Sequence, residues 1–317
     1  MAFVEQSNTS DAQGYTYSCF GLRIRSAMAL PEIADASTPS DDSDRPAVDV
    51  KFGTVPADLP TCAGDQSFQV GDDQVLLKAK DIARYLVRGG CEITIDPAPE
   101  SSLRNVRLFL LGSAFGILCH QRGLLPLHAN AIVANGKAVA FAGDTGAGKS
   151  TLAAYFQRAG YEVLCDDVCV LSFDETGRPF AWPGLPRLKL WRDAAESFGH
   201  DSGELEQAVD GMEKYHVPFS RTASAGPIPF KRLYVLEMDE PGTASKIVRL
   251  RGAAAYEAIW SQTYRNQYLG PMGLKRRHFD QSIALLNHAE VYSAPRVWGF
   301  DVFAQEAGKL ERHLLEA

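Results

Sequence analysis

Residues 127–171 read LHANAIVANGKAVAFAGDTGAGKSTLAAYFQRAGYEVLCDDVCVL, and this stretch decides the fold. Two apolar runs, 129–134 and 137–143, flank Asn135-Gly136, a dipeptide that favours the positive φ angles of a two-residue β-hairpin turn. The second run leads into a glycine-rich segment and then into an apolar pattern of helical period that ends at Gly160. A hairpin, a loop and a helix are therefore predicted in direct succession.

The glycine-rich segment, GDTGAGKS at 143–150, matches the GxxxxGK[ST] pattern of a phosphate-binding loop. Glycines allow backbone conformations that direct successive N–H groups at phosphate oxygens, and the helix N-terminus that follows adds its positive dipole end. We expect Lys149 to neutralise the β- and γ-phosphates of ATP and the Ser150 hydroxyl to bind Mg²⁺. The expected nucleotide-binding residues are Gly143, Asp144, Thr145, Gly146, Ala147, Gly148, Lys149, Ser150 and Thr151.

Asp166 and Asp167 interrupt the apolar strand pattern that follows the helix. Two bare carboxylates are costly in such a strand, so the pair favours a function over a solvated turn. We expect the strand to return beside the loop strand, with one carboxylate holding Mg²⁺ and the other accepting the proton of an incoming hydroxyl. Unless a bulge intervenes, alternation along the strand would send them to opposite faces, and which of them has which role stays open.

His128 and Arg187 are further candidates for catalysis. His128 opens the hairpin, where it is either a hydrogen-bonded structural residue or a partner that orients the Asp pair. Arg187 and Lys189 alternate in PRLKLW, so both should face one side, and a transferred phosphoryl group needs a cation beyond Lys149. Of the two we favour Arg187; a surface charge is its alternative, and Lys214 is expected at the surface.

The remaining sequence divides into two parts. Residues 1–100 carry short strand patterns and predict a small β-rich N-terminal domain, whereas 101–317 would form an α/β catalytic domain that opens with a helix capped by Ser101 or Ser102. Because an antiparallel hairpin feeds the loop, the sheet should be mixed and rich in antiparallel pairs. This disfavours relatives of GTPases and helicases, whose loops follow parallel strands.

Composition narrows the class of protein further. Of 317 residues, 45% are hydrophobic and 22% charged, which excludes a disordered or collagen-like chain, and the net charge of −7 argues against a nucleic-acid binder. The N-terminus lacks the pattern of a signal peptide, and the most apolar stretch, 106–119, is too short to cross a membrane. Six scattered cysteines form no zinc pattern. We expect a cytoplasmic protein with reduced thiols and no membrane segment; its oligomeric state stays open.

Residues 127–171 resemble the catalytic core of the HPr serine kinase/phosphorylase family, through His128, the loop 143–150 and Asp166-Asp167. The resemblance implies a phosphoenolpyruvate-carboxykinase-like P-loop core with an antiparallel-rich mixed sheet, the cofactors ATP and Mg²⁺, and an Asp base near His128. The layout, with LLGSAFGILCHQRGLLPLHA before the loop and PRLKLW after it, is more similar to HPr-kinase-like proteins of lasso-peptide biosynthesis. Those are thought to phosphorylate a serine, often the C-terminal one, of a precursor peptide.

The function expected from sequence is Mg-ATP-dependent transfer of the γ-phosphoryl group to a serine hydroxyl of a protein or peptide. Residues 1–100 would then recognise the substrate or a partner. One alternative is a nucleotide-binding switch or ATPase that signals through its N-terminal domain; others are a true HPr serine kinase and a small-molecule kinase.

Overall fold

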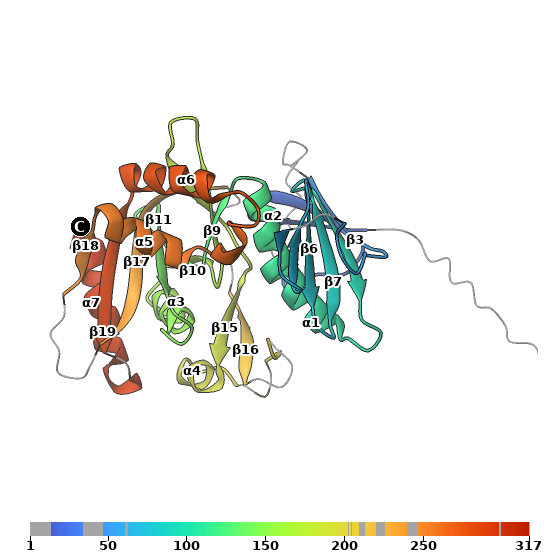
Figure 1. Ribbon diagram of the computed structural model, residues 1–317. Coiled ribbons are helices and arrows are strands. Elements are labelled where there is room, and N and C mark those ends of the chain that lie inside the picture. The colour runs from blue at the N-terminus through green and yellow to red at the C-terminus, as the bar shows by residue number, and fades with distance from the viewer. Residues whose placement is uncertain are drawn as a thin grey trace, which may run out of the picture.

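The computed structural model describes residues 14–33, 47–60, 63–201, 203, 205–208, 213–219, 226–239, 246–297 and 299–316. The predicted absence of a signal peptide and the thiol of Cys62 lie outside the described residues. The other five cysteines, which all lie in the described part of the chain, form no disulfide. The protein has an α/β fold with two large mixed β-sheets, one on either side of a helical segment in the first half of the chain (Figure 1).

Within the described residues, the N-terminal sheet has eight strands in the order β1-β2-β3-β8-β7-β6-β5-β4. These are β1 (Tyr15–Cys19), β2 (Leu22–Ser26), β3 (Ala47–Phe52), β4 (Ala63–Gly64), β5 (Phe68–Val70), β6 (Gln74–Ala79), β7 (Ala83–Arg88) and β8 (Glu92–Pro97). β5 and β6 pair antiparallel as a hairpin, with residues 71–73 at its turn.

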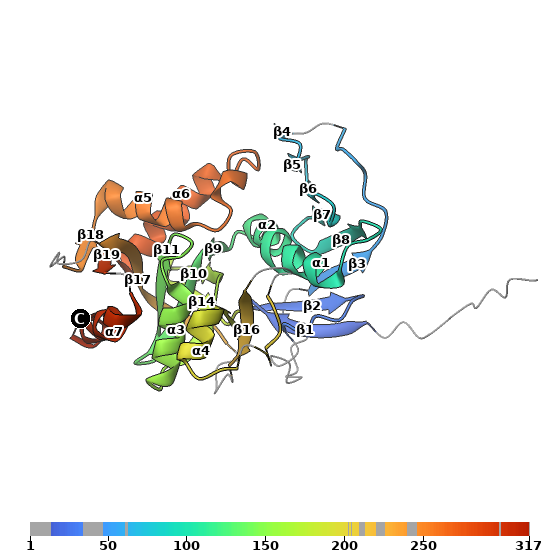
Figure 2. The ribbon, with the colours of Figure 1, turned by 90° about the horizontal axis from the view of Figure 1, so that it is seen from below.

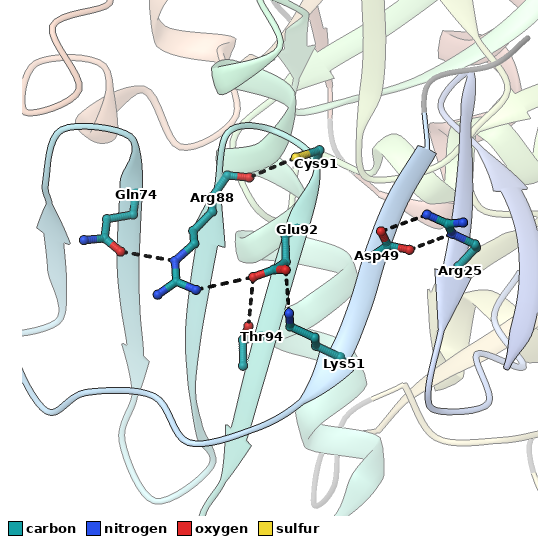
Figure 3. Close-up of polar contacts among 8 residues, drawn as sticks. All are labelled: Arg25, Asp49, Lys51, Gln74, Arg88, Cys91, Glu92 and Thr94. Atoms are coloured by element: carbon teal, nitrogen blue, oxygen red, sulfur yellow. Dashed lines mark hydrogen bonds and ion pairs between the residues drawn. The ribbon is translucent and has the colours of Figure 1, made fainter. Parts of the chain in front are cut away.

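The two faces of this sheet differ because strand side chains alternate. One face buries apolar residues such as Val50, Tyr85 and Ile93 against the helical segment. Polar contacts cross the strands on the other face, where Arg25 pairs with Asp49 at 2.6 Å and Lys51 with Glu92 at 2.5 Å (Figure 3). We call this set of exposed pairs the ion-pair ladder.

The predicted helix after residue 100 is confirmed, with an irregularity in its middle. It runs through α1 (Leu103–Phe109), the π-helical turn η2 (Leu110–Ala114) and α2 (Phe115–Gln121). The Ser102 hydroxyl caps its start by accepting from the Asn105 N–H at 3.2 Å. The apolar residues of this helical segment share one core with the N-terminal sheet, so the two pack as a unit.

Within the described residues, the second sheet has nine strands in the order β12-β10-β11-β17-β14-β13-β9, with β19 beside β17 and β18 beside β19. They are β9 (Leu125–Leu127), β10 (Ala129–Ala134), β11 (Lys137–Gly143), β12 (Glu162–Cys165), β13 (Cys169–Phe173), β14 (Pro179–Trp182), β17 (Ile228–Asp239), β18 (Val248–Leu250) and β19 (Glu290–Val297). Only the pairs of β17 with β11 and with β19 are parallel among the described strands of this sheet, so the antiparallel-rich mixed sheet expected from sequence is present.

Helices cover both faces of the second sheet (Figure 2). On one face α3 (Lys149–Arg158) packs on β10 and β11 and α7 (Phe300–Glu316) on β19, and on the other α5 (Gly252–Gln262) and α6 (Lys275–His288) bury a separate apolar cluster. A two-stranded sheet, β15 (Arg187–Trp191) and β16 (Lys214–Pro218), lies apart with α4 (Arg192–Ser197), and the short helix η3 (Asn266–Tyr268) follows α5. No helix within the described residues is both long and apolar enough to span a membrane.

The prediction of a single strand through Asp166 and Asp167 is wrong. The chain forms two strands there: β12 pairs with β10, whereas β13 pairs with β9 and β14. Because β10 separates β12 from β11, the expectation that this strand returns directly beside the loop strand is also wrong. The physical cause is a tight turn at the Asp pair, described below.

Candidate active site

The glycine-rich loop, Gly143–Ser150, connects β11 to α3. The hairpin before it forms as predicted, with Asn135 and Gly136 both at positive φ. Gly143 has φ +147°, and a Cβ there would lie 2.7 Å from the Leu236 carbonyl oxygen. Gly148 has φ +71° at the start of α3. The glycines are thus required by local conformation and by close packing on β17.

Three buried polar side chains fix this loop from distant parts of the chain. Gln262 at the end of α5 accepts the Gly143 N–H at 2.9 Å through Oε1. Arg296 of β19 donates to the Ala147 carbonyl, and Asn130 of β10 donates to the Lys149 carbonyl. Sequence reasoning missed all three, because each is an isolated polar residue outside any motif. The one sequence signal that could have pointed to them is a polar residue within an apolar run.

Lys149 bends back onto its own loop. Its ammonium donates to the carbonyl oxygens of Gly143 at 2.7 Å and Asp144 at 3.1 Å. Burial lowers the pKa of Lys149 and thereby disfavours its charged form. A bound anion would act in the opposite direction and favour the charged form. These contacts hold the cation next to the loop N–H groups, as the phosphate-binding interpretation requires.

Asp166 lies behind Ser150, fully buried. Its Oδ1 accepts from the Ser150 hydroxyl at 3.0 Å and its Oδ2 from the Lys189 main-chain N–H at 2.8 Å. Burial, reinforced by the neighbouring Asp167, raises the pKa of Asp166. Asp166 is therefore the carboxylate of the pair that contacts Ser150.

Asp167 occupies a γ-turn. It has φ +71°, and the Val168 N–H donates to the Asp166 carbonyl at 2.9 Å, two residues back. A γ-turn with positive φ is rare and strained, and strain of this kind is characteristic of functional sites. The alternation expected from a strand does not apply here, because the turn, rather than a pleat, sets the direction of each carboxylate.

Lys189 and His128 surround the Asp167 turn. The Lys189 ammonium donates to Asp167 Oδ2 at 2.8 Å, and His128 Nδ1 lies 3.0 Å from the Asp167 carbonyl oxygen and 3.6 Å from Oδ1. Burial alone would raise the pKa of Asp167, but the charge and the hydrogen bond of Lys189 hold that pKa below its usual range. Asp167 is thus kept ionised.

The tautomer of His128 follows from its contacts. A carbonyl oxygen can only accept, so Nδ1 carries a proton and, in the neutral ring, the lone pair is on Nε2. Burial lowers the pKa of His128, which favours that neutral ring. The His128 main-chain N–H also donates to the Gln262 carbonyl at 2.7 Å, so one helix end positions both this histidine and the loop.

These groups meet at a cavity of about 190 Å³, called here the loop cavity. It is lined by the predicted residues His128, Thr145, Gly146, Gly148, Lys149, Ser150, Thr151 and Asp167, together with Lys189, Trp191, Asp193 and Lys214. Three of these lining residues are lysines, at positions 149, 189 and 214, and two are carboxylates, Asp167 and Asp193. The excess of lysines leaves a positive charge suited to a polyphosphate. The Trp191 ring, 43% exposed, offers a flat apolar surface at the same cavity.

Arg187 is not among the described residues that line the loop cavity. Its guanidinium donates instead to Glu206 at 3.1 Å and to the Pro31 carbonyl, which lies just after β2. Two residues further along β15, Lys189 is the cation at the Asp pair. Sequence reasoning recognised that the two alternate but favoured the wrong one for this cavity, because the length and direction of the side chains decide which of them reaches it.

The oxygen atoms of Ser150 and Asp166 fit Mg²⁺, which prefers hard oxygen donors and keeps some of its waters. Among the described residues, no cluster of three or more His, Cys, Asp or Glu side chains could hold a metal ion by itself. Two protein oxygens completed by phosphate oxygens and water are the coordination expected for a magnesium–nucleotide complex.

Comparisons with known proteins give a distant structural neighbour. No family model matches the chain, and no curated protein sequence matches it. Among solved structures it is similar to the HPr(Ser) kinase/phosphatase from Coxiella burnetii, with 13% identity over 60% of this chain and 97% of that one, and a TM-score of 0.31. At that TM-score, function has to be inferred from the residues of the site.

Proposed function

We propose that this protein is a Mg-ATP-dependent kinase that transfers the γ-phosphoryl group of ATP to a serine hydroxyl of a protein or peptide. The observation that carries the proposal is the loop cavity, where a helix N-terminus, three lysines and the strained Asp167 turn face one another. Phosphoryl transfer depends on positioning and on neutralising charge, and these groups supply both.

Each residue has a distinct task in this proposal. The loop N–H groups and Lys149 bind the β- and γ-phosphates, and Trp191 receives the base of the nucleotide. Ser150 and Asp166 hold Mg²⁺, which, when bound, neutralises charge on the β- and γ-phosphate oxygens. Asp167 accepts the proton of the acceptor hydroxyl, while Lys189 keeps it ionised and His128 supports its turn.

A finer version of the proposal rests on the resemblance of residues 127–171 alone. The acceptor would be the C-terminal serine of a lasso precursor peptide, with HPr as the alternative protein acceptor. A peptide ending in serine and an HPr protein are therefore the first two acceptors to compare in the assay below.

The test uses γ-labelled ATP, Mg²⁺ and serine-containing peptides. We expect label on serine with the wild-type protein, and a loss of about 10²–10³-fold in Lys149→Ala because a preorganised charge on the phosphates is gone. Lys137→Ala, at the exposed hairpin turn, is the matched control and should retain full transfer. Release of free phosphate alone by the wild type would reject the kinase in favour of an ATPase or switch.

A further inference from the structure

A second cavity, of about 30 Å³, shares the Asp167–Lys189 pair with the loop cavity as part of its wall. We call it the junction cavity, because it is formed where the N-terminal sheet and its helical segment meet the Asp pair and β16. Asp167 and Lys189 line both cavities. Other polar residues of its wall include Glu32, from the turn after β2, Arg107 of α1 and His216 of β16.

In-line transfer requires this kind of arrangement. The attacking oxygen and the leaving oxygen lie on opposite sides of the transferred phosphorus. With the nucleotide bound by the loop and α3, the acceptor hydroxyl has to approach from across Asp167. Because Asp167 lines both cavities, a hydroxyl in the junction cavity would lie beside the same carboxylate that faces the loop cavity.

Glu32, one of the residues that line this cavity, has an unsatisfied carboxylate oxygen. The residue is 7% exposed, and its Oε1 accepts from Arg107 Nε at 2.7 Å. Its other oxygen, Oε2, is buried with no hydrogen-bond partner among the described residues. A buried carboxylate oxygen without a donor is unfavourable, so this position calls for an N–H or O–H group from a ligand.

His216 presents a second buried polar atom, Nδ1, which has no hydrogen-bond partner within the described part of the chain. Burial, together with nearby Lys189, lowers the pKa of His216 to about 3, so the ring is neutral at pH 7. The charges of the wall balance, because Arg104, Arg107 and Lys189 face Glu32, Asp166 and Asp167. An uncharged polar group fits such a wall better than an ion.

The size of the junction cavity limits what can enter. At roughly 10–15 Å³ for each water-sized group, about 30 Å³ holds two or three such groups. The CH₂OH of serine has two non-hydrogen atoms, whereas the phenol of tyrosine has seven. The apolar part of the wall, with Phe20, Leu111 and Leu185, suits a methylene group.

We propose that the junction cavity receives the serine side chain of an extended peptide, and that Glu32 Oε2 accepts a main-chain N–H of that peptide. This inference rests on the proposed kinase function and makes the N-terminal sheet part of the acceptor site. The serine oxygen forms a bond to the γ-phosphorus as the bond from that phosphorus to the bridging oxygen of ADP breaks. The hydroxyl proton passes to Asp167 and then to solvent.

Glu32→Gln tests the role of Glu32. Arg107 needs an acceptor, so the amide would turn its oxygen to Arg107 and its NH₂ into the cavity, placing a donor opposite the peptide N–H. With γ-labelled ATP and a randomised peptide pool carrying a fixed central serine, KM for the pool should rise about tenfold or more, with a much smaller change in kcat. Asp49→Asn, the same change beside Arg25 on the ion-pair ladder, should leave both constants unchanged.

The outcomes separate the two proposals. An unchanged KM in folded Glu32→Gln overturns the acceptor site and leaves the kinase standing, whereas a wild type that labels no peptide overturns the kinase itself. If thermal unfolding shows that Glu32→Gln has lost its fold, His216→Ala is measured in its place. We expect the same rise in KM, and an unchanged KM would again overturn the acceptor site. A pool with tyrosine in place of serine should be labelled at least about tenfold less; equal labelling contradicts the size limit.

Discussion

Arg25 and Asp49 on the ion-pair ladder approach to 2.6 Å, and Lys189 and Asp167 at the loop cavity approach to 2.8 Å. The side chains of the first pair are 57% and 48% exposed, and those of the second 17% and 31%. Water and salt screen the first pair, so it contributes little beyond solubility. In the second, reduced screening lets one lysine keep a carboxylate ionised. Burial, rather than distance, decides what each pair does.

The backbone beneath the two pairs differs as well. The ladder stands on regular strands, where any residue of the same charge could be accommodated. Asp167 stands on a γ-turn that Lys189 contacts from the middle of β15 and His128 from the junction of β9 and β10. Charges in the ladder should therefore be replaceable one at a time, whereas those at the loop cavity should act as a unit.

The largest effect is expected for Asp167→Asn. The amide cannot accept the hydroxyl proton, so transfer to a serine peptide should fall by about 10²–10⁴-fold, with a much smaller change in nucleotide affinity. Single-turnover transfer and nucleotide titration measure the two quantities. Equal losses in both would contradict the assignment and indicate damage to the fold.

Removing the cation of the same pair should give a shift in pH dependence. In Lys189→Met, Asp167 loses the main charge that lowers its pKa, so that pKa rises and the acid limb of kcat/KM moves to higher pH by about one to three units. The pH–rate profile is the measurement. Lys51→Met, which breaks a ladder pair, should leave the profile in place.

Two buried histidines extend the comparison to acid stability. Burial lowers the pKa values of His120 and His278 to about 4, so between pH 6.5 and 4 the unfolded chain binds more protons than the folded one. The stabilisation is complete above pH 6.5 and should fall as the pH drops, by up to about 1.4 kcal/mol per pH unit for each histidine. Denaturant unfolding at several pH values measures it. His278→Gln should reduce the slope, and exposed His288→Gln should not.

The smallest effect is expected on the ladder itself. Asp49→Asn should change the free energy of unfolding by less than about 1 kcal/mol, and added salt should reduce the difference further. Chemical denaturation at low and high salt measures both. A loss of several kcal/mol would show that the ladder supports the fold, against the distinction drawn here.

The parts of the fold that the sequence predicted are the local ones. The Asn135-Gly136 hairpin, the helix capped by Ser102 and the helix ended by Gly160 each have a signal within a few residues. The strand through the Asp pair was predicted wrongly because apolar residues continue on both sides of a turn that only a backbone angle reveals.

The site divides in the same way. The glycine-rich loop and the Asp pair could be found because each is a contiguous motif. The sequence could not show that Lys189 and Gln262 matter more to the site than other polar residues. Their importance comes from contacts with residues 22 or more positions away. Glu32 carried no signal at all, since its neighbours in space come from α1 and β16.

The long-range clamps on the glycine-rich loop have a consequence for biosynthesis. Gly143 is held by a residue 119 positions later and Ala147 by one 149 positions later, and β11 pairs with β17 only after most of the chain has been made. Closing such distant contacts is slow, and during translation it cannot begin until the C-terminal part has left the ribosome. A nascent chain that already contains the whole nucleotide motif would therefore still be unable to bind nucleotide tightly.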